Sequence, residues 1–529
     1  MRTGNNYTNI FTTLNVKGST SIFEHHEYMV FRYVAVELIT SKDDEEKEDV
    51  EQQQQQPPTT IKKDEDEQHS PPFTLTAWTV QYPYFHNDSS FISNSQILND
   101  VWNLCQNTIQ VTSLDTTTDS NTRERLPYEA DGFITGASRL ALQREYQWIQ
   151  HSWRHNIVNP TWPTEWRQTI PLFAEMYYMQ TGNMELYQTF QTEMEIETQY
   201  KCTNSKLHLI DFNHCNRQTA GLGNGNENNL KDIVDWPVSS RDGYIMTNIS
   251  NVINSYAIGG LKALLKLEYT QEKEEQVNQM IQAMNTLCMN GTTQLYTDGY
   301  DNMHAITLNH SSFHANIFPV AFNLTNVSNW PAILQFLTHK GMAGSVYSSY
   351  WALKAAYNMD IDHGVLAMEW MTSCNKNSWC NMIHEGATAT MEAWSVDEKP
   401  NLSWSHPWAT APTSMIVQGV FGIQPLTAKY ETFICKPQVG DLLNGTIKIP
   451  ILKGFIDVEF VHVKNKYFKL KLKTPVGTIG RVCLDKMGLK DLVLIVDGIQ
   501  KIGVAIGDYV CIDGIGSSSH GRVVVRGSL

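Results

Sequence analysis

The hydrophobic pattern of this chain changes period twice, and these changes limit the folds that it can adopt. From Ser95 onward the apolar residues follow helical spacing, first at Ile97, Val101 and Ile109. Patterns of this kind, joined by loops that carry Gly, Asn and Pro, continue to about Pro425. A helical region of this length is too large for a simple four-helix bundle. Paired helices that close into a ring, an (α/α) toroid, would bury this many apolar faces.

Helix-like spacing recurs in the segments that follow. After an intervening loop it appears again at Phe133, Ile134, Leu140, Tyr146 and Ile149. The further helical candidates are residues 171–181, which end before Gly182, and then 184–199, 248–268, 271–288, 348–358 and 410–421. Between them we predict loops and no strands.

Strand-like segments lie on both sides of the helical region. Residues 19–40 and 73–85 are rich in β-branched and aromatic residues, and the polar tract 41–72 between them cannot repay its ordering entropy. After Pro425, the segments ETFICKP, GTIKIPI, FIDVEFVHV, YFKLKLKT, LVLIVDG and GRVVVRG are separated by turn residues, a pattern typical of a β-sandwich. We therefore predict a β region at 1–90 with a disordered insertion at 41–72, a helical domain at 91–425 and a β-sandwich at 426–529.

The charge balance argues against nucleic acid as the main partner, because 40 Lys and Arg face 55 Asp and Glu, a formal net charge of -15. No apolar stretch reaches the roughly 20 residues that span a bilayer, so we predict no membrane partner. The 9 Cys form no CxxC pair, and we find no HExxH motif and no Cys/His cluster. We therefore predict neither a metal nor a cofactor, and the oligomeric state stays open.

The sequence leaves localisation open. The first 20 residues lack the apolar core of a signal peptide. Asn-x-Ser/Thr sequons suit a secretory protein whose signal lies upstream, although a chain rich in Asn and Thr also produces them by chance. They begin at Asn6, Asn87, Asn248, Asn290, Asn309, Asn323, Asn326, Asn401 and Asn444. The chain is secreted or lysosomal if an upstream signal peptide is missing here, and cytoplasmic otherwise.

The segment DTTTDSNTRERLPYEADG, residues 115–132, concentrates charge in a loop between two predicted helices. Its charged side chains include Asp119, Arg123, Glu124, Arg125, Glu129 and Asp131. A loop that is anchored by helices at both ends often displays functional groups. The alternative is a solvated turn with surface ion pairs, in which Asp131 or Glu129 simply caps the next helix.

Aromatic residues surround a second polar cluster, in residues 384–394 and 401–413. Glu392 lies in TMEAW and His406 in SWSHPW. Sugar C–H faces stack on rings while hydroxyls bind carboxylate, Arg and His groups, so this composition favours a carbohydrate site. TWPTEW and VDWP add Trp162, Trp166 and Trp236. The alternative is an aromatic core around a buried histidine.

Glu124 and Glu392 supply the two carboxyl groups that glycoside hydrolysis needs, provided that the two segments face each other. One group would protonate the leaving oxygen and the other would activate water. The sequence does not give their separation, so inversion and retention both remain open from the residues alone.

These motifs resemble those of the α-L-rhamnosidases of glycoside hydrolase family 78. DSNTRERLPYEAD is similar to the signature D-x-x-x-R-E-R-x-x-(W/Y)-x-x-D, and GATATME is similar to G-A-T-T-x-W-E, which ends on the family's catalytic Glu. The resemblance implies an inverting mechanism with Glu124 as general acid and Glu392 as general base. The predicted substrate-binding residues are Asp119, Arg123, Tyr128, Asp131, Trp166, Trp236 and His406.

The resemblance also implies a fold and an activity. The fold is a central (α/α)6 barrel flanked by an N-terminal β-sandwich remnant and a C-terminal β-sandwich. The activity is release of terminal non-reducing α-L-rhamnose from a carbohydrate or glycoside substrate. For an acid that must stay protonated, we expect burial and neighbouring carboxylates to raise the pKa of Glu124, with Arg123 opposing them.

The chain departs from the family pattern at several positions. Tyr128 stands where many members carry Trp, and Thr390 and Met391 stand where an aliphatic residue and a Trp are usual. The chain also opens within what should be a longer N-terminal β region. Two alternatives remain: another six-hairpin hydrolase, similar to trehalase or glucoamylase, and a carbohydrate-binding protein without turnover.

Overall fold

The computed structural model describes residues 2–3, 6–7 and 84–528, except 122, 222–229, 465, 487–492 and 517–521. The predicted N-terminal strands before Tyr84 and the predicted insertion at 41–72 lie outside the described residues. The chain divides into two compact units, and one of them, Thr8–Gln81 with Met1, also lies outside them. The other unit begins with β1 (Arg2–Thr3) and β2 (Asn6–Tyr7), which pair antiparallel.

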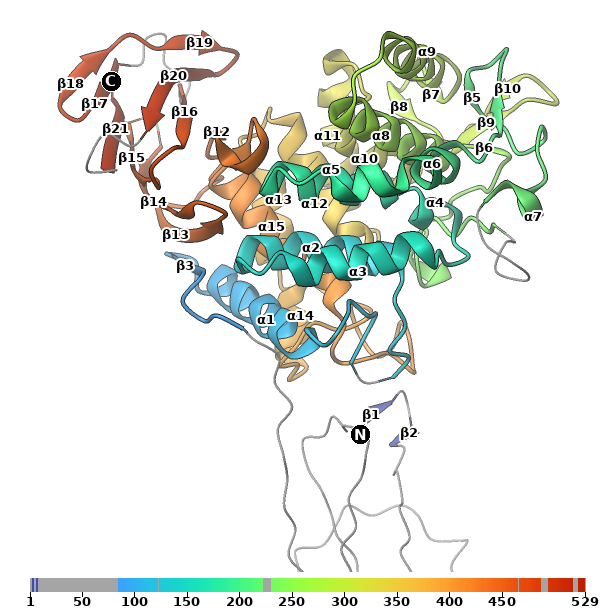
Figure 1. Ribbon diagram of the computed structural model, residues 1–529, viewed down its shortest axis with the longest axis horizontal. Helices are drawn as coiled ribbons and strands as arrows, with labels where there is room; N and C mark the ends of the chain where they lie inside the picture. Colours follow the sequence, from blue (N-terminus) through green and yellow to red (C-terminus); the bar gives the residue numbers. More distant parts are fainter. Residues whose placement is uncertain are drawn as a thin grey trace, which may run out of the picture. The chain divides into compact units, whose positions relative to one another are not determined.

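Helices make up most of the chain between residues 96 and 420 (Figure 1). They are α1 (Gln96–Thr112), α2 (Glu129–Leu142), α3 (Gln147–Val158), α4 (Thr164–Arg167), α5 (Ile170–Thr181), α6 (Glu185–Gln199), α7 (Arg217–Ala220), α8 (Asn251–Leu267), α9 (Gln271–Leu287), α10 (Phe313–Ala321), α11 (Trp330–Lys340), α12 (Ser348–Met359), α13 (Val365–Thr372), α14 (Trp379–His384) and α15 (Ala411–Met415). Every predicted helical segment is confirmed, and a π-helical turn, Ile416–Val420, extends α15.

Local sequence signals fix where several of these helices begin and end. The hydroxyls of Ser95, Ser250 and Thr270 accept hydrogen bonds from backbone amides in the first turns of α1, α8 and α9, as N-cap residues do. Helix α5 ends at Gly182, which has a φ of 71° and therefore adopts the left-handed conformation that glycine tolerates at this position. The predicted end of this helix is thus confirmed.

Stacked aromatic rings form the centre of the helical part. Phe133 of α2 stacks on Trp351 of α12 with a centroid distance of 5.5 Å and an interplanar angle of 1°. Trp153 of α3 and Phe173 of α5 stack at 4.9 Å and 2°. All four side chains are buried, and they connect helices that are far apart in sequence. The many aromatic residues of the chain therefore form its core as well as its candidate site.

Short strands interrupt the helices, so the prediction of a helical region without strands is wrong. They form two two-stranded sheets and one three-stranded sheet in loops between helices. These strands are β4 (Thr203–Asn204), β5 (Leu209–Ile210), β6 (Ile249–Ser250), β7 (Met289–Asn290), β8 (Leu295–Tyr296), β9 (Gly299–Asp301) and β10 (Ile306–Thr307). Each is only two or three residues long, which is too short to leave an alternating pattern in the sequence.

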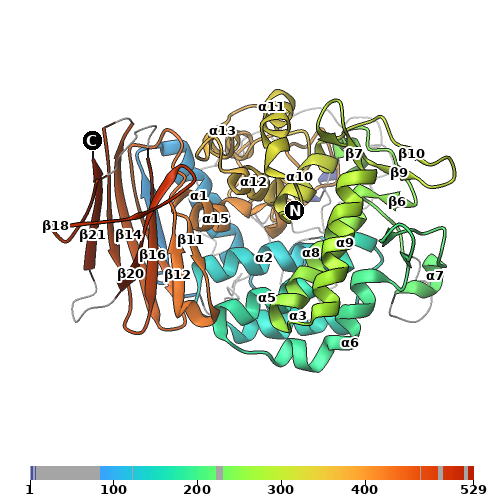
Figure 2. The same cartoon turned by 90° about the horizontal axis from the view of Figure 1, so that it is seen from above.

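Two larger sheets follow the helices (Figure 2). The seven-stranded sheet has the order β18-β17-β21-β15-β14-β13-β3, and the five-stranded sheet has the order β11-β12-β16-β20-β19. Their strands are β3 (Ser90–Ser93), β11 (Ile423–Pro425), β12 (Thr432–Cys435), β13 (Asn444–Ile451), β14 (Gly454–Val463), β15 (Tyr467–Lys473), β16 (Ile479–Asp485), β17 (Val493–Val496), β18 (Ile499–Lys501), β19 (Val504–Ile506), β20 (Tyr509–Gly516) and β21 (Arg522–Ser528). The six predicted strand segments are confirmed, while β3, β11, β16, β18, β19 and β20 were not predicted.

Strand β3 comes from the other side of the helical region and completes the larger sheet. It pairs antiparallel with β13, with Ser93 opposite Gly445 (Figure 1). Alternate residues of β14 and β15 are buried, which gives the sheet one face toward a core. The architecture is thus a helical domain consistent with a six-hairpin toroid, followed by a β-rich C-terminal part.

Three disulfides and no membrane span are found in the described part of the chain. The disulfides join Cys202 to Cys215, Cys374 to Cys380 and Cys483 to Cys511. Cys483 and Cys511 lie on the paired strands β16 and β20, so this bond crosslinks the five-stranded sheet. No described helix has both the length and the apolar character that crossing a bilayer requires.

Candidate active site

A closed loop before α2 presents the first pair of predicted site residues. The amide of Asp119 donates to the carbonyl of Leu126 at 2.8 Å, and the Leu126 amide donates to Oδ1 of Asp119 at 2.7 Å. Oδ2 of Asp119 accepts from the Ser120 hydroxyl at 2.9 Å. Both oxygens of Asp119 therefore hold the loop, and Arg123 and Glu124 lie at its tip.

A second closed loop presents Glu392. The Glu392 amide donates to the carbonyl of Ser403 at 3.0 Å, and the Ser403 amide donates to Oε2 of Glu392 at 2.8 Å. The indole of Trp408 donates to the carbonyl of Glu392 at 3.2 Å. Backbone and carboxylate of Glu392 are thus both fixed by the loop that follows it.

Arg123 brings the two loops together. Its Nη2 donates to Oε1 and Oε2 of Glu392 at 3.1 and 3.2 Å, across 269 residues of sequence. Its Nη1 contacts Oε1 of Glu124 at 2.5 Å. One guanidinium group therefore lies between the two carboxylates that the sequence pairs as acid and base. The two segments therefore face each other, which is the condition for pairing Glu124 with Glu392.

Glu392 also contacts a cation that the sequence motifs did not indicate. Lys399 Nζ lies 2.7 Å from Oε1 of Glu392, and both side chains are largely buried. Burial alone would raise the pKa of Glu392, but the electrostatic effects of His406 and Lys399 and the hydrogen bonds from Lys399 and the Ser403 amide outweigh it and lower that pKa. Glu392 is therefore ionised at neutral pH, as a general base must be.

Glu124 has a different environment from the one predicted. Its side chain is 34% exposed, so the burial that we expected for the general acid is only partial. The Tyr128 hydroxyl donates to Oε2 of Glu124 at 3.4 Å. Neither Glu129 nor Asp131 is the N-cap residue of α2, because Tyr128 occupies that position. Glu129 instead accepts a hydrogen bond from the Thr161 amide at 2.5 Å.

Three buried groups, Asp119, Asp131 and His406, form the floor of this site. Nε2 of His406 lies 3.9 Å from Asp119, and Nδ1 lies 3.7 Å from Asp131. Burial lowers the pKa of His406 to about 3 and raises that of Asp119 to about 6. Burial and the neighbouring carboxylates raise the pKa of Asp131 well above its usual range. His406 is therefore neutral at neutral pH, and its contacts with these acids are not ion pairs.

Because His406 is neutral in the folded protein, we expect the free energy of unfolding to depend on pH. Its pKa is lowered in the folded protein, so the stability that it contributes is present above pH 6.5 and is lost as the pH falls toward 3. Between pH 7 and pH 5 this loss is about 2 kcal/mol. The raised pKa of Asp119 acts in the opposite direction over the same interval.

A variant without this histidine separates its contribution to the pH dependence from that of other groups. When the pH falls from 7 to 5, the free energy of unfolding of His406→Asn is expected to decrease by about 2 kcal/mol less than that of the wild type. Thermal unfolding of both proteins at the two pH values measures this difference. Equal pH dependence in the two proteins would show that folding does not lower the pKa of His406.

Several buried polar atoms in this region have no hydrogen-bond partner within the described protein. They are both carboxylate oxygens of Asp131, Nδ1 of His406, Nε of Arg123, Nε1 of Trp166 and the hydroxyl of Ser405. A buried polar group without a partner is costly, and such groups are rare in folded proteins. Their concentration beside Glu392 identifies a place where a polar ligand would complete the hydrogen bonding.

Aromatic rings border the same region. Trp166 contacts Tyr128 at a centroid distance of 5.7 Å and Trp408 at 6.1 Å, and both contacts are edge-on. Trp408 also lies 4.5 Å from the ring of His406. Tyr128, Trp166 and His406, which the sequence assigns to one sugar site, are therefore connected in space.

Trp236 is positioned by a separate set of contacts. Its indole is 36% exposed, and among the described residues no ring contact joins it to the other aromatic residues of the site. Its amide donates to Oδ1 of Asp235 at 2.8 Å. Glu165, next to Trp166, accepts from the Ile233 amide at 3.1 Å and also from the Val234 amide. The segment before Trp236 is therefore attached to the segment that carries Trp166.

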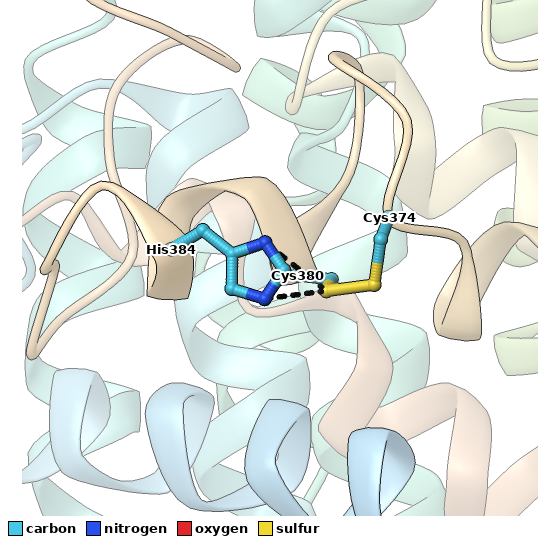
Figure 3. A group of neighbouring side chains, drawn as sticks. All are labelled: Cys374, Cys380 and His384. Atoms are coloured by element: carbon cyan, nitrogen blue, oxygen red, sulfur yellow. Dashed lines mark hydrogen bonds between the residues drawn. A yellow bond between two sulfur atoms is a disulfide. The ribbon is translucent and has the colours of Figure 1, made fainter.

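One Cys/His cluster that we did not find in the sequence lies beside the Glu392 loop (Figure 3). Cys380 and His384 belong to α14, with the Cys380 sulfur 3.7 Å from Nε2 of His384, and Cys374 approaches from the preceding loop. The two sulfur atoms are bonded to each other, so as a disulfide they do not act as thiolate ligands for a metal. The Met391 amide donates to the Met382 sulfur, which ties α14 to the Glu392 loop.

Comparison with known families agrees with this geometry. The sequence profile of the bacterial α-L-rhamnosidase six-hairpin glycosidase domain matches residues 86–420. The chain belongs to this family. The matched region contains both closed loops and the Arg123 contacts that join them. No match is found among curated proteins.

Several solved structures with similar folds are α-L-rhamnosidases. The enzyme from Dictyoglumus thermophilum superposes with a TM-score of 0.65 at 14% identity, covering 84% of this chain and 50% of that one. The Streptomyces avermitilis enzyme, complexed with L-rhamnose, gives 0.63 at 13% identity, with 84% and 42% coverage. The Aspergillus terreus enzyme gives 0.61 at 12% identity, with 83% and 50% coverage. The chain thus spans half or less of the length of these relatives.

Proposed function

We propose that this chain is a glycoside hydrolase that releases terminal non-reducing α-L-rhamnose from rhamnosides. The observation that carries the proposal is the placement of Glu124 and Glu392 on either side of the Arg123 guanidinium, within a domain of the α-L-rhamnosidase family. Glycoside hydrolysis needs two carboxyl groups that flank the scissile bond. The binding of L-rhamnose by the Streptomyces avermitilis relative supports the choice of sugar.

The two carboxyl groups take complementary roles in an inverting mechanism. Glu124 donates a proton to the glycosidic oxygen as the bond to the anomeric carbon breaks. Glu392, held ionised, accepts a proton from the water that attacks that carbon from the opposite face. Inverting pairs are about 6.5 to 9.5 Å apart, which leaves room for this water. The Arg123 guanidinium between the carboxylates keeps them apart and so supports this assignment.

The remaining predicted residues bind the sugar. Asp131 and His406 offer buried acceptors without protein partners, which suit sugar hydroxyl donors. Arg123 donates hydrogen bonds to hydroxyl oxygens, and the Asp119 carboxyl keeps the loop of Arg123 closed. The aromatic residues Tyr128, Trp166 and Trp236 form apolar walls for sugar C–H faces.

The domain boundaries that we predict from the sequence complete this proposal. Residues 91–425 form the catalytic domain as an (α/α)6 barrel, and 426–529 form the C-terminal β-sandwich. The reaction uses only carboxyl groups and water, so the proposal includes no metal and no cofactor.

Hydrolysis of aryl glycosides tests the proposal. We expect release of p-nitrophenol from p-nitrophenyl α-L-rhamnoside at a rate at least tenfold above that from p-nitrophenyl α-D-glucoside, because the family motif and not the fold alone sets the sugar. Preference for the glucoside would favour a glucoamylase-like or trehalase-like enzyme. Binding of L-rhamnose without hydrolysis of either compound would indicate a carbohydrate-binding protein.

A further inference from the structure

We infer that Lys399 is a positioning residue for the proposed general base: its ammonium group orients the Glu392 carboxylate and keeps it ionised. The inference rests on the proposed function, and it concerns a residue outside both sequence motifs. Lys399 is only 10% exposed on its side chain, and its Nζ lies 2.7 Å from Oε1 of Glu392. A buried lysine at this distance from a buried carboxylate differs from the solvated surface pairs that contribute little.

Hydrogen bonds close the loop that carries Lys399, so Lys399 lies beside Glu392. Glu392 and Ser403, 11 residues apart, close the loop by hydrogen bonds in both directions. Within it, Oε2 of Glu398 accepts from the Trp394 amide at 3.1 Å. The Leu402 amide donates to the carbonyl of Lys399 at 3.0 Å. These bonds fix the backbone on both sides of Lys399, so its position relative to Glu392 is set by the fold.

Arg123 alone cannot supply the charge that Glu392 needs, because it also binds Glu124. Its single positive charge is shared by two carboxylates. Among the described residues, Lys399 is the other cation within ion-pair distance of Glu392, and no ion pair ties it to a different acid. Lys399 therefore gives Glu392 a positive charge that it does not share with Glu124.

The other titratable groups that face Glu392 add no positive charge. They are His406, Asp131, Asp119 and, across Arg123, Glu124. His406 is neutral at neutral pH because burial lowers its pKa to about 3, and burial and the nearby carboxylates, Glu392 among them, raise the pKa of Asp131. Removing Lys399 would leave Glu392 buried beside acids with only a shared arginine as counter-charge.

The Lys399 contact also helps to fix the orientation of the Glu392 carboxylate. Oε1 contacts both Lys399 and Arg123, whereas Oε2 accepts from the Ser403 amide and Arg123. With contacts on both oxygens, the carboxylate plane is fixed. A general base needs such fixed geometry as well as its negative charge, because the attacking water must lie in line with the breaking bond.

The pH dependence of kcat/KM in Lys399→Met tests the inference. Its acid limb, which reports protonation of the base, is expected to move upward by about one to three pH units. Lys399→Arg keeps the positive charge, so its acid limb is expected to lie close to that of the wild type. Lys376→Met is the matched control, since Lys376 is 58% exposed and pairs only with the exposed Asp397. An unchanged acid limb in Lys399→Met would overturn the inference.

A second measurement does not depend on turnover. The pKa of Glu392 is followed by ¹³C NMR of the glutamate carboxyl carbons, with Glu392→Gln identifying the signal. The inference expects this pKa to rise by about one to three pH units in Lys399→Met and in Lys399→Gln. No rise in either folded variant would contradict it. If the wild type hydrolyses no glycoside, the proposed function fails, and the NMR titration still decides whether Lys399 keeps Glu392 ionised.

Discussion

Replacement of Glu392 by Gln is expected to lower kcat on p-nitrophenyl α-L-rhamnoside by about 10²- to 10⁴-fold, the usual contribution of a general base. Glutamine keeps the size of the side chain but cannot accept the proton of the attacking water. KM is expected to change far less, because Asp131, His406 and Arg123 remain in place to bind the sugar. Steady-state kinetics across pH measures both parameters, and the acid limb of the wild-type profile is expected to disappear in the variant.

Replacement of Glu124 by Gln distinguishes the acid from the base. A p-nitrophenolate leaving group needs little protonation, whereas the alkoxide of a disaccharide needs a great deal. The loss in kcat for Glu124→Gln is therefore expected to be smaller on the aryl glycoside than on a rhamnosyl disaccharide, while Glu392→Gln impairs both substrates similarly. The basic limb of the pH profile is expected to disappear only in Glu124→Gln. A profile that keeps this limb would contradict the assignment of Glu124.

A control variant at a carboxylate outside the site and the stereochemistry of the product complete this test. Glu369→Gln, on the exposed side of α13, changes the same chemical group away from the site and is expected to keep wild-type kinetics. Proton NMR early in wild-type turnover is expected to show β-L-rhamnose as the first product, because one displacement inverts the anomeric carbon. α-L-Rhamnose as the first product would replace the inverting mechanism with a retaining one.

The sequence predicted most of the helices, because their apolar periodicity is strong. Segments such as 271–288 carry an N-cap threonine and an amphipathic pattern, so local rules determine them. The two motifs that hold the proposed acid and base were equally readable, since their residue types and spacing suit that chemistry. That the loops of Glu124 and Glu392 face each other was left open by the sequence, because no local pattern states which loops meet.

Features that depend on tertiary contacts were missed. Strand β3 has only four residues and belongs to a sheet whose other strands lie beyond residue 443, so nothing near it in sequence indicates its partner. Lys399 reads as one charged residue in a polar loop, and only the closure of that loop by Ser403 places it on Glu392. The partial exposure of Glu124 was also hidden, since exposure follows from packing that the motif does not encode.

Asp235 illustrates how a buried acid outside the catalytic pair supports the site. Oδ2 accepts from Nε2 of His314 at 2.6 Å and from the Ser345 amide at 2.9 Å. Oδ1 accepts from the Ser345 hydroxyl and from the Trp236 amide. All of these polar groups except Trp236 are fully buried. The carboxylate thus joins three segments and holds the residue that we propose as a wall of the sugar site.

Asp235→Ala is therefore expected to destabilise the protein by about 3 to 5 kcal/mol, as removal of one partner of a buried charged network does. The loss arises because His314, Ser345 and the Trp236 amide keep their donors but lose the acceptor. Thermal and urea unfolding measure this effect. The variant is also expected to raise KM for the aryl rhamnoside more than it lowers kcat, since Trp236 contacts the sugar and not the reacting atoms in our proposal.

Asp397→Ala is the matched control for this prediction. Asp397 is 79% exposed and lies 3.6 Å from the exposed Lys376, so its removal is expected to cost less than about 1 kcal/mol. A destabilisation of Asp235→Ala no larger than that of the control would mean that the network carries little free energy. A large destabilisation with unchanged KM would instead separate the two roles: Asp235 would hold the fold, and Trp236 would not contact the sugar.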